Sequence, residues 1–155
     1  MQLTGKNLIA GVEAVDGRTR YAALDPSGEL ALAPEFIAAS RDEVDRALQE
    51  AEGALGPYTA ASPRQRADLL RGMAEEILAL GEQLVERCCA ETGLPAARIE
   101  GERGRTVGQL RMFADLVDEG SWVDARIDTA LPDRQPLAKP DLRRMLRPLG
   151  PIVVF

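Results

Sequence analysis

Apolar positions follow a helical pattern in the middle of the chain. Between residues 93 and 120 they recur at steps of three and four, which predicts an amphipathic helix with these apolar residues on one face: Val107, Leu110, Phe113, Ala114 and Val117. Gly101, Gly104 and Gly108 fall nearly opposite that face. Each glycine costs about 1 kcal/mol relative to alanine inside a helix. A bare face of this kind leaves room for another backbone or a small molecule. The alternative is a solvent-facing helix start that carries solvated arginines.

Local signals predict three further helices before this one. Ser40 and Ser62 are each followed three positions later by Glu or Gln, which is the spacing of a capping box and marks a helix start. We expect Gly56-Pro57 to end the first helix and Gly81 to interrupt the second. A third helix is predicted for residues 82–92, where Gly93 follows as a C-terminal cap.

The beginning of the chain reads as β-structure. Residues 7–14 and 19–24 predict two short strands joined by a tight hairpin around Asp16-Gly17. Asp25-Pro26-Ser27-Gly28 has the residue order of a type I turn. We interpret this segment as a β-rich entrance to the fold without a site of its own.

The period of the pattern changes from 3.6 to 2 after Gly120. Residues 123–128 alternate apolar and charged side chains, which predicts a half-buried strand, and residues 142–147 are expected to form the returning strand. A β-ribbon that projects from a helical body is a pairing edge for another chain. The alternative is an ordinary surface hairpin.

The last residues carry no alternation. Ile152 to Phe155 are all apolar, as in a strand buried on both faces of a parallel sheet. We interpret them as the first strand of a nucleotide-binding α/β layer and the chain as the front portion of a longer protein. The alternative is a strand that pairs with another polypeptide. The expected class is α/β, divided into residues 1–121, a β-ribbon at 122–147 and the start of a sheet at 148–155.

Composition excludes several functions. The 155 residues carry a net charge of −6, which argues against nucleic-acid binding. No run of about 18 apolar residues and no signal peptide is present, so we expect a cytoplasmic protein without a membrane partner. Histidine is absent, which removes His-dependent catalysis, and we expect no metal site. Cys88 and Cys89 are adjacent and lie near glutamates, so we predict structural cysteines, neither of them a nucleophile, and no disulfide between them.

The order and spacing of several motifs resemble those in the N-terminal part of the aldehyde dehydrogenase superfamily. The chain is most similar to the branch that oxidises α-ketoglutaric semialdehyde, also called 2,5-dioxovalerate. The matching segments are residues 25–29, 91–95, 101–106, 109–114 and 147–155. The resemblance implies a fold that consists of a β-hairpin entrance, about four helices, a projecting ribbon and the first strand of a Rossmann-like layer. It also implies NADP or NAD as cofactor, a small aldehyde as substrate and a homo-oligomer, either a dimer or a tetramer.

The resemblance also implies which residues contact ligands. Arg105 matches a residue of the substrate entrance, with Gly101 and Gln109 one turn away, and Phe155 matches the beginning of the cofactor site. The family's cysteine nucleophile, glutamate base and oxyanion-binding asparagine lie beyond the position that matches Phe155. We therefore expect the 155-residue chain to be inactive by itself. The alternative function is a non-catalytic helical module that mediates interaction or oligomerisation.

Overall fold

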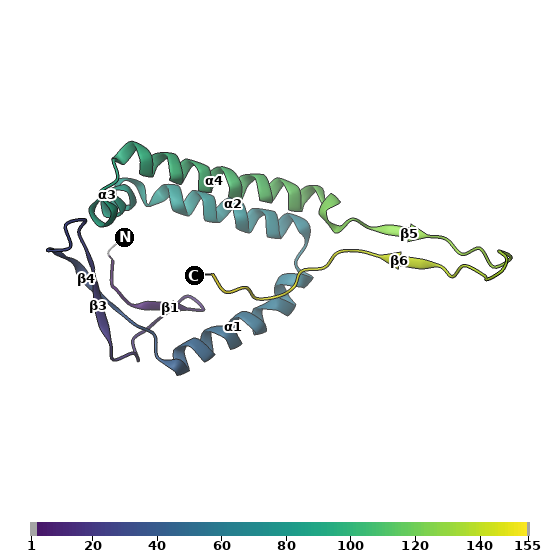
Figure 1. Ribbon diagram of the computed structural model, residues 1–155, viewed down its shortest axis with the longest axis horizontal. Helices are drawn as coiled ribbons and strands as arrows, with labels where there is room; N and C mark the ends of the chain where they lie inside the picture. The colour runs from purple at the N-terminus through teal and green to yellow at the C-terminus, as the bar shows by residue number, and fades with distance from the viewer. Residues whose placement is uncertain (1–2, 155) are drawn as a thin grey trace.

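The computed structural model describes residues 3–154, which form four helices and three small antiparallel sheets (Figure 1). The α-helices are α1 (Arg41–Ala60), α2 (Pro63–Ala79), α3 (Gly81–Thr92) and α4 (Ala96–Glu119), and a short 3₁₀ helix η1 (Ser121–Val123) follows. The strands are β1 (Asn7–Ile9), β2 (Val12–Ala14), β3 (Arg20–Leu24), β4 (Ala31–Ile37), β5 (Arg126–Asp128) and β6 (Leu142–Arg144). The long helices α2 and α4 lie side by side, and the β5–β6 ribbon projects from their end (Figure 1).

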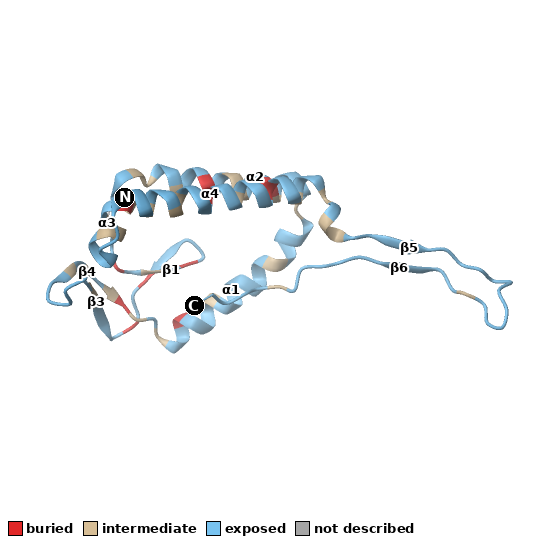
Figure 2. Cartoon of the chain, turned by 45° about the horizontal axis from the view of Figure 1, so that its top comes forward, coloured by how far each residue is buried: buried red, intermediate tan, exposed pale blue. Residues whose placement is uncertain are grey.

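Small residues allow α2 and α4 to pack closely. Ala67 and Ala74 of α2 and Ala114 of α4 are fully buried, and Val107 of α4 is nearly so. Alanine places no side-chain bulk between two helices, so their backbones approach each other. Figure 2 shows that the few buried residues lie in these helices and at the strand end of the molecule, whereas the ribbon is exposed along nearly its whole length. Val107 and Ala114 of the predicted apolar face are therefore buried and Leu110 and Val117 are half-buried, whereas Phe113 is 49% exposed, contrary to the prediction.

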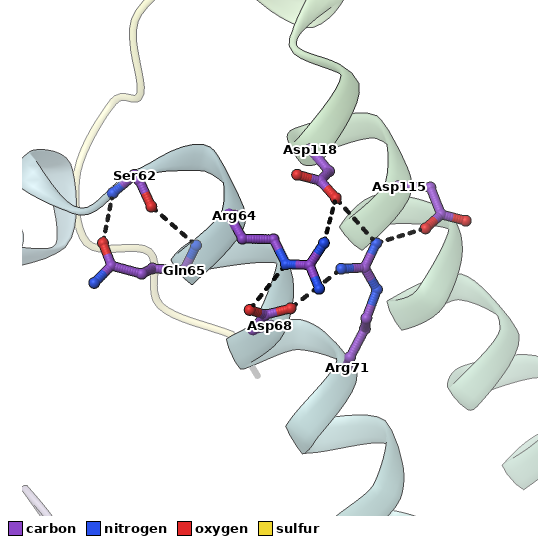
Figure 3. A network of polar contacts seen from close by, with 7 residues as sticks. All are labelled: Ser62, Arg64, Gln65, Asp68, Arg71, Asp115 and Asp118. Atoms are coloured by element: carbon purple, nitrogen blue, oxygen red, sulfur yellow. Dashed lines mark hydrogen bonds and ion pairs between the residues drawn. The ribbon is translucent and has the colours of Figure 1, made fainter.

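An ion-pair network joins α2 to the end of α4 (Figure 3). Arg71 Nη2 lies 2.9 Å from Asp115 Oδ1 and 3.5 Å from Asp118 Oδ2, and Arg64 Nη1 lies 3.8 Å from Asp118 Oδ2. The hydrogen bond from Arg71 to Asp115 raises the pKa of the Arg71 guanidinium above its ordinary value. These ion pairs connect α2 with α4, but exposed ion pairs contribute little to the free energy of folding.

Both predicted capping boxes are present. In the first, the Ser40 hydroxyl accepts a hydrogen bond from the Glu43 amide, and the Ser40 amide donates to Glu43 Oε2 at 2.7 Å. The second uses Ser62 and Gln65 in the same way (Figure 3). The carboxylate of Glu43 also accepts a hydrogen bond from the Asp16 amide at 3.0 Å, and Glu43 is only 1% exposed. One carboxylate thus caps α1 and holds the loop that precedes β3.

The free energy of unfolding should decrease at acidic pH, in part because the carboxylate of Glu43 becomes protonated. The hydrogen bond from the Ser40 amide lowers the pKa of Glu43 below its ordinary value of 4.5, with a smaller contribution from the Asp16 amide. The folded state favours the ionised carboxylate, so its stabilisation is present above pH 4.5 and is lost as the pH falls through the lower folded-state pKa. Glu43→Gln should flatten the pH dependence of the unfolding free energy over this window.

Urea unfolding at a series of acidic pH values measures this effect. The matched control is Glu52→Gln, which changes an exposed glutamate of the same helix. Its pH dependence should follow the wild type. Parallel curves for Glu43→Gln and the wild type would contradict the assigned role of the Glu43 carboxylate.

The predicted end of the first helix is wrong. Helix α1 continues through Pro57 to Ala60, and the Ala61 amide still donates to the carbonyl oxygen of Pro57 at 3.1 Å. A proline in the last turn removes only its own N–H from the helical pattern, and the residues after it keep their bonds. Helices α3 and α4 end as expected, at Gly93 and Gly120, which both adopt positive φ.

The predicted pairing of the first strands is also wrong. Strand β1 pairs with β2 across Ala10-Gly11, whose positive φ angles of 50° and 78° suit a tight hairpin. Strand β3 pairs with β4 instead, through the expected Asp25–Gly28 turn, in which the Gly28 amide donates to the Asp25 carbonyl at 2.9 Å. Asp16-Gly17 forms no hairpin, because the Asp16 amide is engaged by Glu43.

The β-ribbon is present, but its strands are not half-buried. Strands β5 and β6 pair in the expected antiparallel manner, yet each has three residues and all are exposed. Val123 lies in η1 instead of a strand and accepts a hydrogen bond from the Leu146 amide at 2.8 Å, which closes the base of the ribbon. The ribbon extends away from the body, so within residues 3–154 neither of its faces is covered (Figure 2).

The expected strand at residues 152–155 is not formed in its described part. Ile152, Val153 and Val154 belong to no strand and are 76%, 60% and 87% exposed. A strand needs a neighbour for its backbone hydrogen bonds, and none is provided to them by residues 3–154. The division into residues 1–121, 122–147 and 148–155 stays a prediction.

Candidate functional site

The predicted substrate residues lie together on the exposed side of α4. Gly101, Gly104 and Gly108 are exposed, and within residues 3–154 a Cβ atom on any of them would meet no atom within 4 Å apart from the nearby helix backbone. Arg105 lies among them with 63% of its side chain exposed, and Gln109 follows one turn later, also exposed. The predicted bare helix face is therefore present, with an arginine in its middle.

Arg105 is bound to a carboxylate of its own helix. Its Nε lies 2.8 Å from Glu102 Oε2, and the other oxygen of Glu102 lies 2.8 Å from Arg98 Nη2. The hydrogen bond from Arg105 lowers the pKa of Glu102 below its ordinary value of 4.5, and the charges of Arg105 and Arg98 lower it further. Two guanidinium groups and one carboxylate leave this group with a net charge of +1. Within residues 3–154 the two terminal nitrogens of Arg105 have no hydrogen-bond partner.

Sequence reasoning did not identify Glu102 as part of this group. The signal was nevertheless present, because Glu102 stands four residues after Arg98 and three before Arg105. Side chains at these spacings are neighbours on a helix surface.

The neighbouring arginines of α4 are used for packing. Arg103 Nη1 donates to the Gly81 carbonyl oxygen at 2.9 Å and ties α4 to the start of α3. Arg111 Nη2 lies 2.7 Å from Glu75 Oε1 and ties α4 to α2. Among these three, Arg105 alone contacts only its own helix, as Arg98 also does through Glu102. A ligand on Arg105 would therefore not loosen the contacts between helices.

A cavity of about 630 Å³ lies away from this face, between β4 and α3. Its lining is mainly apolar and includes Pro34, Leu84 and Arg87. The Arg87 guanidinium donates to the Ala33 carbonyl and to Glu91, and it lies 5.6 Å from the ring centre of Phe36. Its Nε and Nη1 are thus engaged within the fold, whereas its Nη2 is buried without a hydrogen-bond partner among the described residues. None of the predicted substrate residues lines this cavity.

The remaining predictions concern cysteines, metals and the cofactor residue. Cys88 and Cys89 are free and half-buried in α3. Within the described residues no group of three or more His, Cys, Asp or Glu side chains is arranged to hold a metal ion. No helix in that part of the chain is long and apolar enough to cross a membrane. Phe155, the predicted cofactor contact, lies outside the described residues.

Comparison with known proteins identifies the family. The model of the aldehyde dehydrogenase family matches residues 13–154, so the chain belongs to this family. It is 52% identical to alpha-ketoglutaric semialdehyde dehydrogenase 2 of Azospirillum brasilense, and the match covers 100% of this chain and 30% of that protein. It is 48% identical to an alpha-ketoglutaric semialdehyde dehydrogenase of Acinetobacter baylyi over 77% of this chain and 23% of that protein. The chain thus spans less than a third of the length of these relatives.

Solved structures confirm the fold. A NAD-dependent benzaldehyde dehydrogenase from Corynebacterium glutamicum matches 86% of this chain and 28% of its own with a TM-score of 0.71 and 22% identity. A betaine aldehyde dehydrogenase from Staphylococcus aureus, solved with NAD⁺, matches 85% of this chain and 27% of its own with a TM-score of 0.74 and 17% identity. The resemblance seen in the sequence motifs and the expected fold are both confirmed.

Proposed function

We propose that this chain is the N-terminal part of an NAD(P)-dependent aldehyde dehydrogenase that oxidises α-ketoglutaric semialdehyde to the corresponding carboxylate. The observation that carries the proposal is the 52% identity, over the whole chain, to a relative named for that activity. The alternative, a non-catalytic interaction module, is not favoured by the same comparison.

The proposed contribution of this chain is to bind the end of the substrate that does not react. α-Ketoglutaric semialdehyde carries a carboxylate remote from its aldehyde, and an arginine recognises a carboxylate by two parallel charge-assisted hydrogen bonds. The free terminal nitrogens of Arg105 supply such donors, and the neighbouring glycines Gly101 and Gly104 allow close approach. Gln109 would contact the same substrate one turn further along α4.

The cofactor would accept the hydride that leaves the substrate in this oxidation. NAD and NADP both remain open, since no described residue distinguishes a ribose hydroxyl from a phosphate. Phe155 is the one residue of this chain that we propose to lie at the cofactor.

We further propose that the enzyme is a cytoplasmic homo-oligomer, a dimer or a tetramer, in which the β5–β6 ribbon contacts another subunit. The support is the exposure of the ribbon, whose strands β5 and β6 each have one unpaired edge within the described chain. Such edges are ready to pair with a strand of another subunit.

The proposed function is tested by following the formation of reduced cofactor. Purified protein from a reading frame that extends beyond residue 155 should reduce NAD or NADP when α-ketoglutaric semialdehyde is added, and it should sediment as a dimer or tetramer. The 155-residue chain should give no reduction above a control without enzyme. Reduction by this short chain that is abolished by mutating Cys88 or Cys89 would contradict the assignment. A longer protein that reduces neither cofactor with any semialdehyde would contradict it as well.

A further inference from the structure

Glu102 already binds the guanidinium group of Arg105, at its Nε edge. Its Oε2 lies 2.8 Å from Arg105 Nε, which is the geometry of a charge-assisted hydrogen bond. We propose that Glu102 is an internal competitor for Arg105 and thereby sets how tightly the site binds a carboxylate-bearing aldehyde. This inference rests on the proposed function, because it concerns the substrate contact of Arg105.

The geometry of the guanidinium group makes Glu102 oppose any second carboxylate. A guanidinium offers a carboxylate either the edge that includes Nε or the end that carries the two terminal nitrogens. A substrate at the Nε edge has to displace Glu102, which already binds there. A substrate at the free end places its charge on the same small guanidinium plane as the Glu102 carboxylate, and the two like charges repel each other.

Arg98 makes the displacement of Glu102 feasible. It holds the second oxygen of Glu102 at 2.8 Å, so Glu102 keeps a cationic partner when it leaves Arg105. Among the described residues, no atom apart from the nearby helix backbone lies within 4 Å of the Cβ positions of Gly101 and Gly104, which leaves room beside Arg105. The exchange of one carboxylate for another therefore requires no change in the backbone of α4.

Glu102 could also orient Arg105 for the substrate, but this effect is weaker than the repulsion between Glu102 and the substrate carboxylate. An ion pair between residues i and i+3 on an exposed helix surface restricts its side chains only slightly. Repulsion between two carboxylates that share one guanidinium acts whenever the substrate is bound. Removing the charge of Glu102 should therefore strengthen the binding of a charged substrate.

The test is Glu102→Gln in the complete enzyme, since glutamine keeps the length and one acceptor oxygen but carries no charge. The KM for α-ketoglutaric semialdehyde should fall about three- to tenfold, because the competing charge is removed while the reacting end of the substrate is untouched. Pentanal, an uncharged aldehyde of the same length, should show no comparable gain. In the double variant Glu102→Gln with Arg105→Ala the gain should disappear, which would show that it acts through Arg105.

Glu100→Gln is the matched control, because it removes the same charge from an exposed position of the same helix. An equal fall in KM for this variant would assign the effect to overall charge and overturn the inference. An unchanged or raised KM in Glu102→Gln, with Arg105→Ala still selective for the charged substrate, would overturn the inference and leave the proposed function standing. If Arg105→Ala affects both substrates equally, the proposed substrate contact fails and the role of Glu102 fails with it.

Discussion

Replacing Arg105 by alanine in the complete enzyme should lower kcat/KM for α-ketoglutaric semialdehyde about ten- to a hundredfold. The variant loses the charge-assisted hydrogen bonds that the terminal nitrogens of Arg105 are proposed to donate to the distal carboxylate. A contact made equally in the ground state and the transition state changes KM more than kcat, so we expect the loss mainly in KM. Pentanal has no carboxylate and should be oxidised by the variant and the wild type alike.

Two further variants make the result specific to this contact. Arg105→Lys keeps the charge but loses the planar fork, and it should recover only part of the activity. Arg41→Ala removes an exposed arginine from a different helix, α1, and it is the matched control. Equal activity of Arg105→Ala on both aldehydes, with unchanged folding, would return Arg105 to a solvated surface residue. Arg103 and Arg111 would then be the next candidates, although both already hold neighbouring helices.

Gly17→Ala should destabilise the fold by about 3 kcal/mol. A Cβ atom on Gly17 would lie 1.8 Å from the Ala38 carbonyl oxygen and 3.0 Å from Cγ2 of the buried Ile37. The closer neighbour is backbone and belongs to the segment between β4 and α1, so the clash is relieved only by moving the chain. Ile37 would lose part of its packing in that movement.

Gly104→Ala is the control for this prediction, and it should change stability in the opposite direction. Gly104 lies in the interior of α4 with open space around it, and alanine is favoured there by up to about 1 kcal/mol. Urea unfolding followed by circular dichroism compares both variants with the wild type. Similar unfolding midpoints for Gly17→Ala and the wild type would mean that the loop before β3 does not pack against residue 38 in solution.

Signals between near neighbours in the sequence were sufficient for the two capped helix starts, the glycine helix ends and one of the two predicted turns. The capping boxes at Ser40 and Ser62 and the glycine at position 93 were predicted and are present. The Asp25–Gly28 turn is also formed as predicted. These features depend on hydrogen bonds between residues at most four positions apart, so the residues that form them are visible together in the sequence. The identity of the family was likewise carried by motifs in a fixed order.

The candidate site was only partly visible in the same way. The three glycines and Arg105 on one face of α4 follow from the helical period. The helical period does not predict which residue each arginine binds, because Arg103 and Arg111 form hydrogen bonds with residues more than 20 positions away in the sequence. Only the packing of α4 against α2 and α3 shows that these two are engaged and that Arg105 is left on the open side.

The pairing of the first strands was decided by tertiary structure. Asp16-Gly17 has the sequence of a tight turn, but Glu43, 27 residues later, binds the Asp16 amide, and the hairpin forms at Ala10-Gly11 instead. The exposure of the β5–β6 ribbon also depends on tertiary structure. The alternation of apolar and charged residues shows which face of a strand can be buried, but not whether another segment covers it. The sequence by itself thus determined the capped helix starts, the glycine ends of α3 and α4 and the Asp25–Gly28 turn, because those depend on local hydrogen bonds, but it did not determine the end of α1. Strand partners, buried faces and the availability of Arg105 depend on contacts between distant segments, and only the tertiary structure decided them.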